Sequence, residues 1–192
     1  TSFGDNIAMS KDGTTLVIGA PGVDNGNQAD AGAVYYYKWD ADGDSTLSYT
    51  LQQTLKAPDN RSNMKFGSSL DLNDDGSRLI IGAEKFANDR EMKFDLGETT
   101  FDLQDTAIVD LNIGSGGVYT ATMYNTKFVI DDRLVTSSVS ENDDFGRGVC
   151  VTDGTVYVGS PEDLGNDDST VSNDGTVTVF DITTKCAYAW KN

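Results

Sequence analysis

The chain has 192 residues, with 31 acidic against 14 basic side chains and no histidine, so its formal net charge is −17 at pH 7. Phosphate backbones and anionic membrane surfaces are repelled by such a charge, which argues against nucleic acid as a partner. The lack of histidine removes Ser-His-Asp and Cys-His nucleophile systems and histidine zinc sites, and no apolar run reaches the roughly 18 residues of a membrane span.

One sequence motif occurs three times along the chain. Each copy opens on Phe-Gly, continues through an Asp-Gly pair and an apolar run that ends in Gly-Ala or Gly-Ser, and resumes at Gly-x-Val. The Phe-Gly pairs are Phe3-Gly4, Phe66-Gly67 and Phe145-Gly146. Each copy of a long repeat is a unit that buries its faces against its neighbours. We therefore expect Phe3, Phe66 and Phe145 to be buried equivalents between adjacent units.

Each copy predicts four antiparallel strands. The Asp-Gly pairs favour tight hairpin turns, in which Gly13, Gly76 and Gly154 take positive backbone angles. The run that follows the turn, such as Leu16 to Ile18, is continuously apolar and predicts a strand covered on both faces. A third strand starts at Gly-x-Val, and in the first copy a fourth spans Leu47 to Leu55.

The Phe-Gly opening, the Gly-Ala-Pro close and the Gly-x-Val-Tyr strand resemble FG-GAP repeats, the blades of the integrin alpha-chain propeller. The resemblance implies an all-β, β-propeller-like fold of three four-stranded antiparallel FG-GAP-type blades, either an incomplete propeller or one completed by oligomerisation. The predicted blades are residues 1–62, 63–140 and 141–192. The second contains residues 84–116, which read as an inserted hairpin, either a decorative edge or an interaction surface.

Calcium is the one cofactor that the sequence suggests, because hard cations take clustered oxygen ligands. Asp71, Asn73 and Asp75 resemble the start of the integrin-type calcium hairpin, but the closing acid is missing. Asp40, Asp42 and Asp44 form a second acidic turn, although Leu51 stands where an EF-hand loop would close with an acid. A plain acidic turn is the alternative for both stretches.

Three further features concern processing and cross-linking. Asn60 begins an Asn-Arg-Ser sequon and is the predicted glycosylation site. Cys150 and Cys186 fall on the first and fourth strands of the third blade, too far apart to pair in a regular blade, so they are expected as buried thiols, as partners of another copy or as an irregular bridge. The start at Thr1, without an initiator methionine, indicates a removed leader or preceding segment.

These observations favour a non-enzymatic, extracellular or cell-surface module, structural or adhesive, with no catalytic residues. It would self-assemble into a ring or filament, or belong to a larger propeller, and would bind a protein or glycan ligand without inserting into a membrane. One alternative is a calcium-dependent ligand-binding propeller segment. The distant alternative is a carboxylate-dependent glycoside hydrolase, since 31 acids supply many close pairs by chance.

Overall fold

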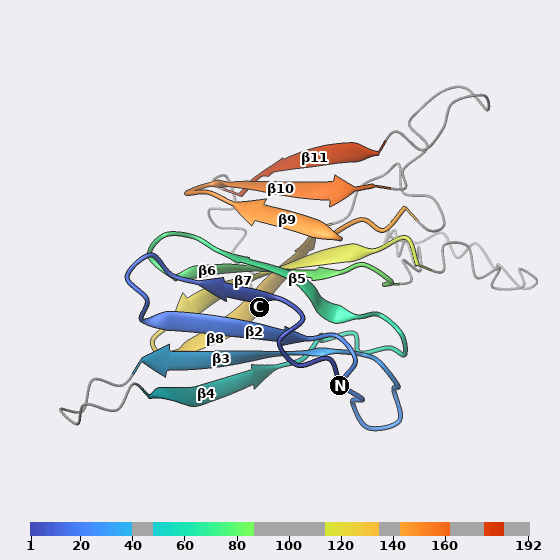
Figure 1. The fold of residues 1–192 in the computed structure, drawn as a ribbon. Helices are drawn as coiled ribbons and strands as arrows, with labels where there is room; N and C mark the ends of the chain where they lie inside the picture. Colours follow the sequence, from blue (N-terminus) through green and yellow to red (C-terminus); the bar gives the residue numbers. More distant parts are fainter. Residues whose placement is uncertain (40–47, 87–113, 135–142, 162–174, 183–192) are drawn as a thin grey trace, which may run out of the picture.

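Three antiparallel sheets lie face to face in the computed structural model (Figure 1). The structure describes residues 1–39, 48–86, 114–134, 143–161 and 175–182. These residues form eleven strands and no helix, so the predicted all-β, propeller-like fold is confirmed. The fourth strand expected in the third blade and nearly all of the inserted segment 84–116 lie outside the described residues.

Each sheet is one blade, with its strands in sequence order from one edge to the other. Blade 1 contains β1 (Ile7–Met9), β2 (Thr15–Ala20), β3 (Ala33–Trp39) and β4 (Tyr49–Leu55). Blade 2 contains β5 (Phe66–Leu72), β6 (Arg78–Ala83), β7 (Gly117–Tyr124) and β8 (Lys127–Leu134). The described part of blade 3 contains β9 (Gly148–Val151), β10 (Thr155–Ser160) and β11 (Thr176–Asp181).

The strand register repeats from blade to blade, which identifies equivalent positions. A row of three residues runs across the first three strands of each blade, on the same face. The rows are Ile7–Ile18–Tyr35, Leu70–Ile81–Tyr119 and Val149–Val158–Thr178. Because side chains alternate between the two faces of a strand, the shared register means that equivalent residues lie on the same face of every blade.

The hairpin turns follow the sequence prediction in two blades and depart from it in the third. Gly13 and Gly76 take φ values of 72° and 70°, as expected for Asp-Gly turns. Gly154 does not take a positive φ, so the prediction is wrong for this glycine. The turn between β9 and β10 is shorter: the Thr152 N–H donates to the Thr155 carbonyl at 2.9 Å, which closes the hairpin without a left-handed glycine.

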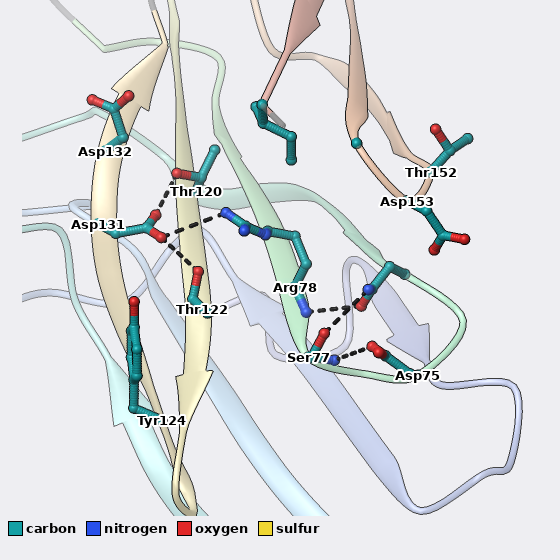
Figure 2. A pocket seen from close by; sticks show the side chains of 13 residues that line it. Asp75, Ser77, Arg78, Thr120, Thr122, Tyr124, Asp131, Asp132, Thr152 and Asp153 are labelled. Atoms are coloured by element: carbon teal, nitrogen blue, oxygen red, sulfur yellow. Dashed lines mark hydrogen bonds and ion pairs between the residues drawn. The ribbon is translucent and has the colours of Figure 1, made fainter. Parts of the chain in front are cut away.

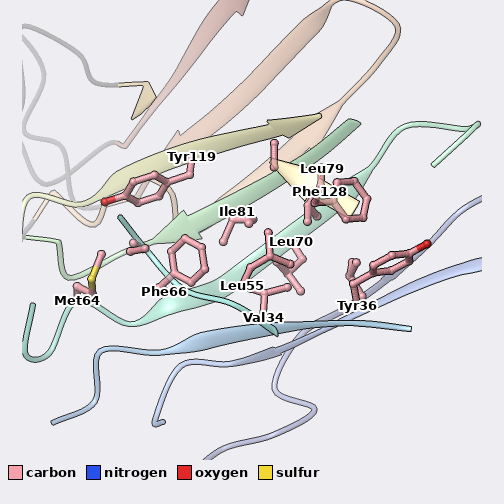
Figure 3. Packing of buried hydrophobic residues seen from close by; sticks show 14 of the residues in the cluster. Val34, Tyr36, Leu55, Met64, Phe66, Leu70, Leu79, Ile81, Tyr119 and Phe128 are labelled. Atoms are coloured by element: carbon pink, nitrogen blue, oxygen red, sulfur yellow. The ribbon is translucent and has the colours of Figure 1, made fainter. Parts of the chain in front are cut away.

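Hydrophobic side chains fill the spaces between the blades. The larger cluster lies between blades 1 and 2, where β5 lies against β1 and β2 (Figure 3). Its aromatic members include Tyr36, Phe66, Tyr119 and Phe128, which form two edge-to-face ring pairs with centroids 5.1 and 5.3 Å apart. A second cluster joins blades 2 and 3 through Ile80, Val118, Leu134, Phe145, Val156 and Val158.

The Phe-Gly openings connect neighbouring blades. Phe66 forms a parallel bridge to Gly32 of blade 1, and Phe145 forms the same bridge to Gly116 of blade 2. Both phenylalanines are fully buried, but Phe3 is 52% exposed. The prediction of burial is therefore wrong for Phe3, because no blade among the described residues packs on its side of blade 1.

The segment between blades 1 and 2 is held by a buried tyrosine. Asp59 accepts a hydrogen bond from the Tyr119 hydroxyl at 2.5 Å and forms an ion pair with Arg133. The Arg133 guanidinium lies 4.9 Å from the centroid of the Phe86 ring, a cation–π contact. Burial and the Asp59 carboxylate raise the pKa of Tyr119, so its phenol stays protonated as a donor.

Candidate functional site

An open cavity of about 940 Å³ lies between blades 2 and 3, at the end where the Asp-Gly hairpins turn. Figure 2 shows that its walls come from β6, β7 and β8 of blade 2 and from the β9–β10 turn. Four carboxylates face this region against a single arginine: Asp75, Asp131, Asp132 and Asp153, with Arg78. The cavity is therefore an acidic, water-accessible surface.

Asp131 is the best-held carboxylate of the cavity. It accepts hydrogen bonds from the hydroxyls of Thr120 and Thr122, both at 2.5 Å, and lies 3.5 Å from the Arg78 guanidinium (Figure 2). Two hydroxyl donors and one guanidinium therefore converge on this carboxylate. Its oxygens thus serve to hold β6, β7 and β8 together at this end of the blade.

The structure separates the three residues of the predicted calcium hairpin. Asp71 points toward blade 3, where it accepts the Val151 N–H at 2.7 Å. Asn73 accepts the Arg78 N–H at 2.8 Å, and Asp75 accepts the Ser77 N–H at 2.8 Å, so both close their own hairpin turn. The hydrogen bonds to Ser77 lower the pKa of Asp75.

Within the described ranges, no group of three or more aspartate, glutamate, histidine or cysteine side chains is arranged to hold a metal ion. Asp40, Asp42 and Asp44 lie outside those ranges. Calcium binding stays a prediction that rests on the sequence.

Asn60 lies in the segment between blades 1 and 2, and Cys150 lies on β9 of blade 3. Asn60 is half-buried, and its amide nitrogen donates to the Asn25 carbonyl at 3.3 Å. Cys150 is exposed on β9, so the expectation of a buried thiol is wrong for this cysteine. Its partial desolvation and the neighbouring Asp71 carboxylate nevertheless raise the pKa of the thiol. Cys186 falls outside the described residues, so the expected absence of a bond between the two cysteines stays a prediction.

The outer face of blade 1 is an uncovered apolar surface. Ile7, Met9 and Leu51 are 58%, 50% and 47% exposed. The half-buried apolar residues around them are Leu16, Ile18, Tyr35 and Tyr37. In blade 2 the equivalent positions carry Leu70, Leu72, Leu79 and Ile81, which are buried under blade 1. The outer face of blade 1 therefore has the composition of a face that receives another blade.

The outer face of blade 3 is also apolar and exposed, but it corresponds to the face of blade 1 that packs on blade 2. Tyr157, Val177 and Val179 are 40%, 67% and 57% exposed. Their equivalents Val17, Val34 and Tyr36 in blade 1 are buried against blade 2. The sequence predicted an incomplete or oligomer-completed propeller but no residue of these two faces. Aligning the three copies and comparing alternate positions along each strand would have identified them.

Residues 1–37, which span β1, β2 and most of β3, match the family model of the FG-GAP repeat. The chain carries an FG-GAP repeat. The matched part includes the Phe3-Gly4 opening and the Gly32 at which the next blade bridges. FG-GAP repeats are typically non-enzymatic propeller modules and occur in extracellular and cell-surface proteins. A comparison with curated protein sequences finds no match.

Among the described residues, no helix is long and apolar enough to cross a membrane.

Proposed function

We propose that this chain is a non-enzymatic extracellular module, structural or adhesive, that joins further FG-GAP-type blades through its two outer faces. One observation carries the proposal: the outer face of blade 1 is built like the covered face of blade 2 and is left open. Exposed apolar patches of this extent mark interaction sites in soluble proteins. The FG-GAP repeat supports the extracellular setting.

The state of the carboxylates supports a non-catalytic role. A glycoside hydrolase needs one carboxylic acid whose pKa is raised so that it can protonate the leaving group. Among the described residues, the carboxyl groups with displaced pKa values are Asp12, Asp30 and Asp75, and hydrogen bonds to their neighbours lower the pKa of each.

The proposal is tested by sedimentation velocity over a concentration series, with one charge placed on the outer face of blade 1. Ile18→Asp introduces a carboxylate at the half-buried centre of that face, whereas Asn125→Asp places the same charge on the exposed β7–β8 turn of the middle blade. We expect the native chain and Asn125→Asp to form larger species and Ile18→Asp to remain single. A native chain that stays single at all concentrations contradicts the proposal.

A further inference from the structure

We propose that two copies of this chain close into a six-bladed ring, in which blade 3 of each copy packs on blade 1 of the other through a Phe3-Gly4 contact. The inference rests on the function proposed above and names the partner: a second copy of the same chain. It is carried by the glycines at which one blade meets the next.

Two equivalent glycines show how closely adjacent blades approach. A Cβ atom on Gly19 of β2 would lie 2.2 Å from the Gly67 carbonyl oxygen of blade 2. On Gly82 of β6 it would lie 2.1 Å from the Gly146 carbonyl oxygen of blade 3. Each blade therefore keeps a glycine where the Phe-Gly backbone of the next blade rests on it.

Gly159 of β10 stands at the third such position, and no described residue occupies the space above it. A Cβ atom there would meet only the Gly148 carbonyl oxygen, at 3.6 Å, which is an ordinary contact. Its φ does not lie in the left-handed region, so nothing among the described residues requires a glycine at this position. In the proposed ring the carbonyl oxygen of a partner's Gly4 lies above Gly159, and this close contact explains why the position is a glycine.

The Phe3-Gly4 opening already has the conformation that it needs. The residues before the three phenylalanines, Ser2, Lys65 and Asp144, have φ values of 47°, 58° and 53°. The glycines after them, Gly4, Gly67 and Gly146, have φ values of 88°, 89° and 93°. Yet a Cβ atom on Gly4 would meet nothing within 4 Å, whereas on Gly146 it would lie 2.8 Å from blade 2.

The acceptor for Phe3 is equally well defined. Gly32 and Gly116, which bridge to Phe66 and Phe145, have a φ of 89° each, and Gly175 at the equivalent point of blade 3 has a φ of 69°. The outer face of blade 3 beside Gly175 presents the exposed Val177 and Val179. Phe3 of one copy thus bridges to Gly175 of the other, and the apolar rows of both faces are covered.

Two copies give a number of blades that a closed propeller accommodates. Closed propellers contain about four to eight blades. The described residues of one chain form three sheets, so two copies supply six, and three copies would exceed this range. With two copies, both outer faces of each chain are covered and no apolar face remains open.

Light scattering after size exclusion, at micromolar concentration, compares three proteins. We expect twice the 20.6 kDa chain mass for the native chain. Gly159→Ala places a methyl group against the partner's Gly4, so it gives 20.6 kDa with an unchanged melting temperature. Gly148→Ala is the matched control on the same face: its equivalents are Asn6 and Ser69, so the interface accepts a side chain and the mass stays doubled.

The outcomes separate this inference from the proposed function. A native mass of 20.6 kDa overturns both. Larger native species that Gly159→Ala leaves intact, or masses beyond two chains, overturn the ring and leave an assembling module in place. If Gly159→Ala fails to fold, Phe3→Ala decides, because Phe3 is exposed in the single chain; we expect it to weaken association on the order of a hundredfold, and an unchanged dissociation constant rejects the contact.

Discussion

At the scale of single residues, Phe66 and Phe145 show how one side chain joins two blades. Each is fully buried, and each is bridged through its backbone to a glycine of the preceding blade. Truncating either to alanine opens a cavity between blades, and we expect a loss of about 3 to 5 kcal/mol in the free energy of unfolding. Urea denaturation measures the loss.

Phe3→Ala is the internal comparison for this prediction. Phe3 is half exposed and touches the chain mainly through an edge-to-face contact with Tyr35, with centroids 5.2 Å apart. In dilute single chains we expect Phe3→Ala to lower the free energy of unfolding much less than Phe66→Ala or Phe145→Ala does. Equal losses at all three positions would show that the phenylalanines act within their own blades and not between them.

Asn60 offers a second test at this scale. From a eukaryotic secretory source we expect a glycan on Asn60, because its side chain is only half-buried and is held by two long hydrogen bonds with Asn25, both of 3.3 Å. Intact-mass analysis before and after glycosidase treatment measures occupancy. Ser62→Ala removes the sequon and serves as the control, and an unmodified Asn60 from such a source ends the claim.

Residue roles were predictable from sequence where the repeat fixes the environment. Burial of Phe66 and Phe145 follows from their place in the motif, but Phe3 has the same place and a different neighbour, which no local pattern reveals. Asp71 has calcium-like spacing to Asn73, yet its carboxylate is used by the Val151 N–H of the next blade. Local spacing cannot show a partner that lies 80 residues away.

At the scale of elements, the close approach of β6 to blade 3 makes a strong prediction. Gly82→Ala places a methyl group in steric conflict with the Gly146 carbonyl oxygen and the Ser69 hydroxyl oxygen, each 2.1 Å from the Cβ position. Because backbone must move to accommodate it, we expect a loss of at least about 2 kcal/mol in the free energy of unfolding.

Gly148→Ala, with nothing within 4 Å of its Cβ position, is the control in β9 and should be neutral or slightly stabilising, since alanine has less freedom in the unfolded chain. Thermal denaturation of both variants checks the contrast. A tolerated Gly82→Ala would mean that blades 2 and 3 do not pack as closely as described.

The link between Tyr119 and Asp59 predicts a loss of stability in alkali. Because the folded pKa of Tyr119 is raised above the unfolded value of about 10, its contribution is complete below that pH and is lost as the pH rises above it. Burial also raises the pKa of Tyr36, so both phenols contribute to the fall. Tyr119→Phe should reduce the slope of unfolding free energy against pH, by at most about 1.4 kcal/mol per pH unit.

The exposed Tyr124 provides the control, and Tyr124→Phe should leave this slope unchanged. Urea titrations between about pH 9 and 11 measure both variants. If Tyr119→Phe keeps the full alkaline slope, Tyr119 ionises as freely in the folded chain as in the unfolded one.

Elements were predictable because each strand is marked twice, by its apolar pattern and by its turn. The strand expected over Leu47 to Leu55 is observed as β4 from Tyr49, and the Asp-Gly turns of blades 1 and 2 have the expected backbone angles. What the sequence could not supply is the connection between blades. The contact of Tyr119 with Asp59 depends on packing across two sheets, and neither residue type signals it alone.

At the scale of the whole molecule, the net charge of −17 opposes association of two copies. If the interface is the apolar one described above, its attraction does not depend on ion pairs, and salt mainly screens the repulsion. We expect the dissociation constant to fall as sodium chloride is raised from about 0.05 to about 0.5 M. Sedimentation equilibrium measures it, and weaker association at high salt would show instead that ion pairs hold the copies together.

The bridge from each Phe-Gly opening to a glycine of the blade before it also sets an order in time. Gly32 precedes Phe66 in the chain, and Gly116 precedes Phe145. Within one chain, each of these glycines is therefore synthesised before the Phe-Gly segment that bridges to it. During translation a completed sheet is thus available as a template when the next one emerges, and each new blade adds to a finished surface. We expect the blades to fold in sequence order during synthesis, beginning with blade 1 at the N-terminal end.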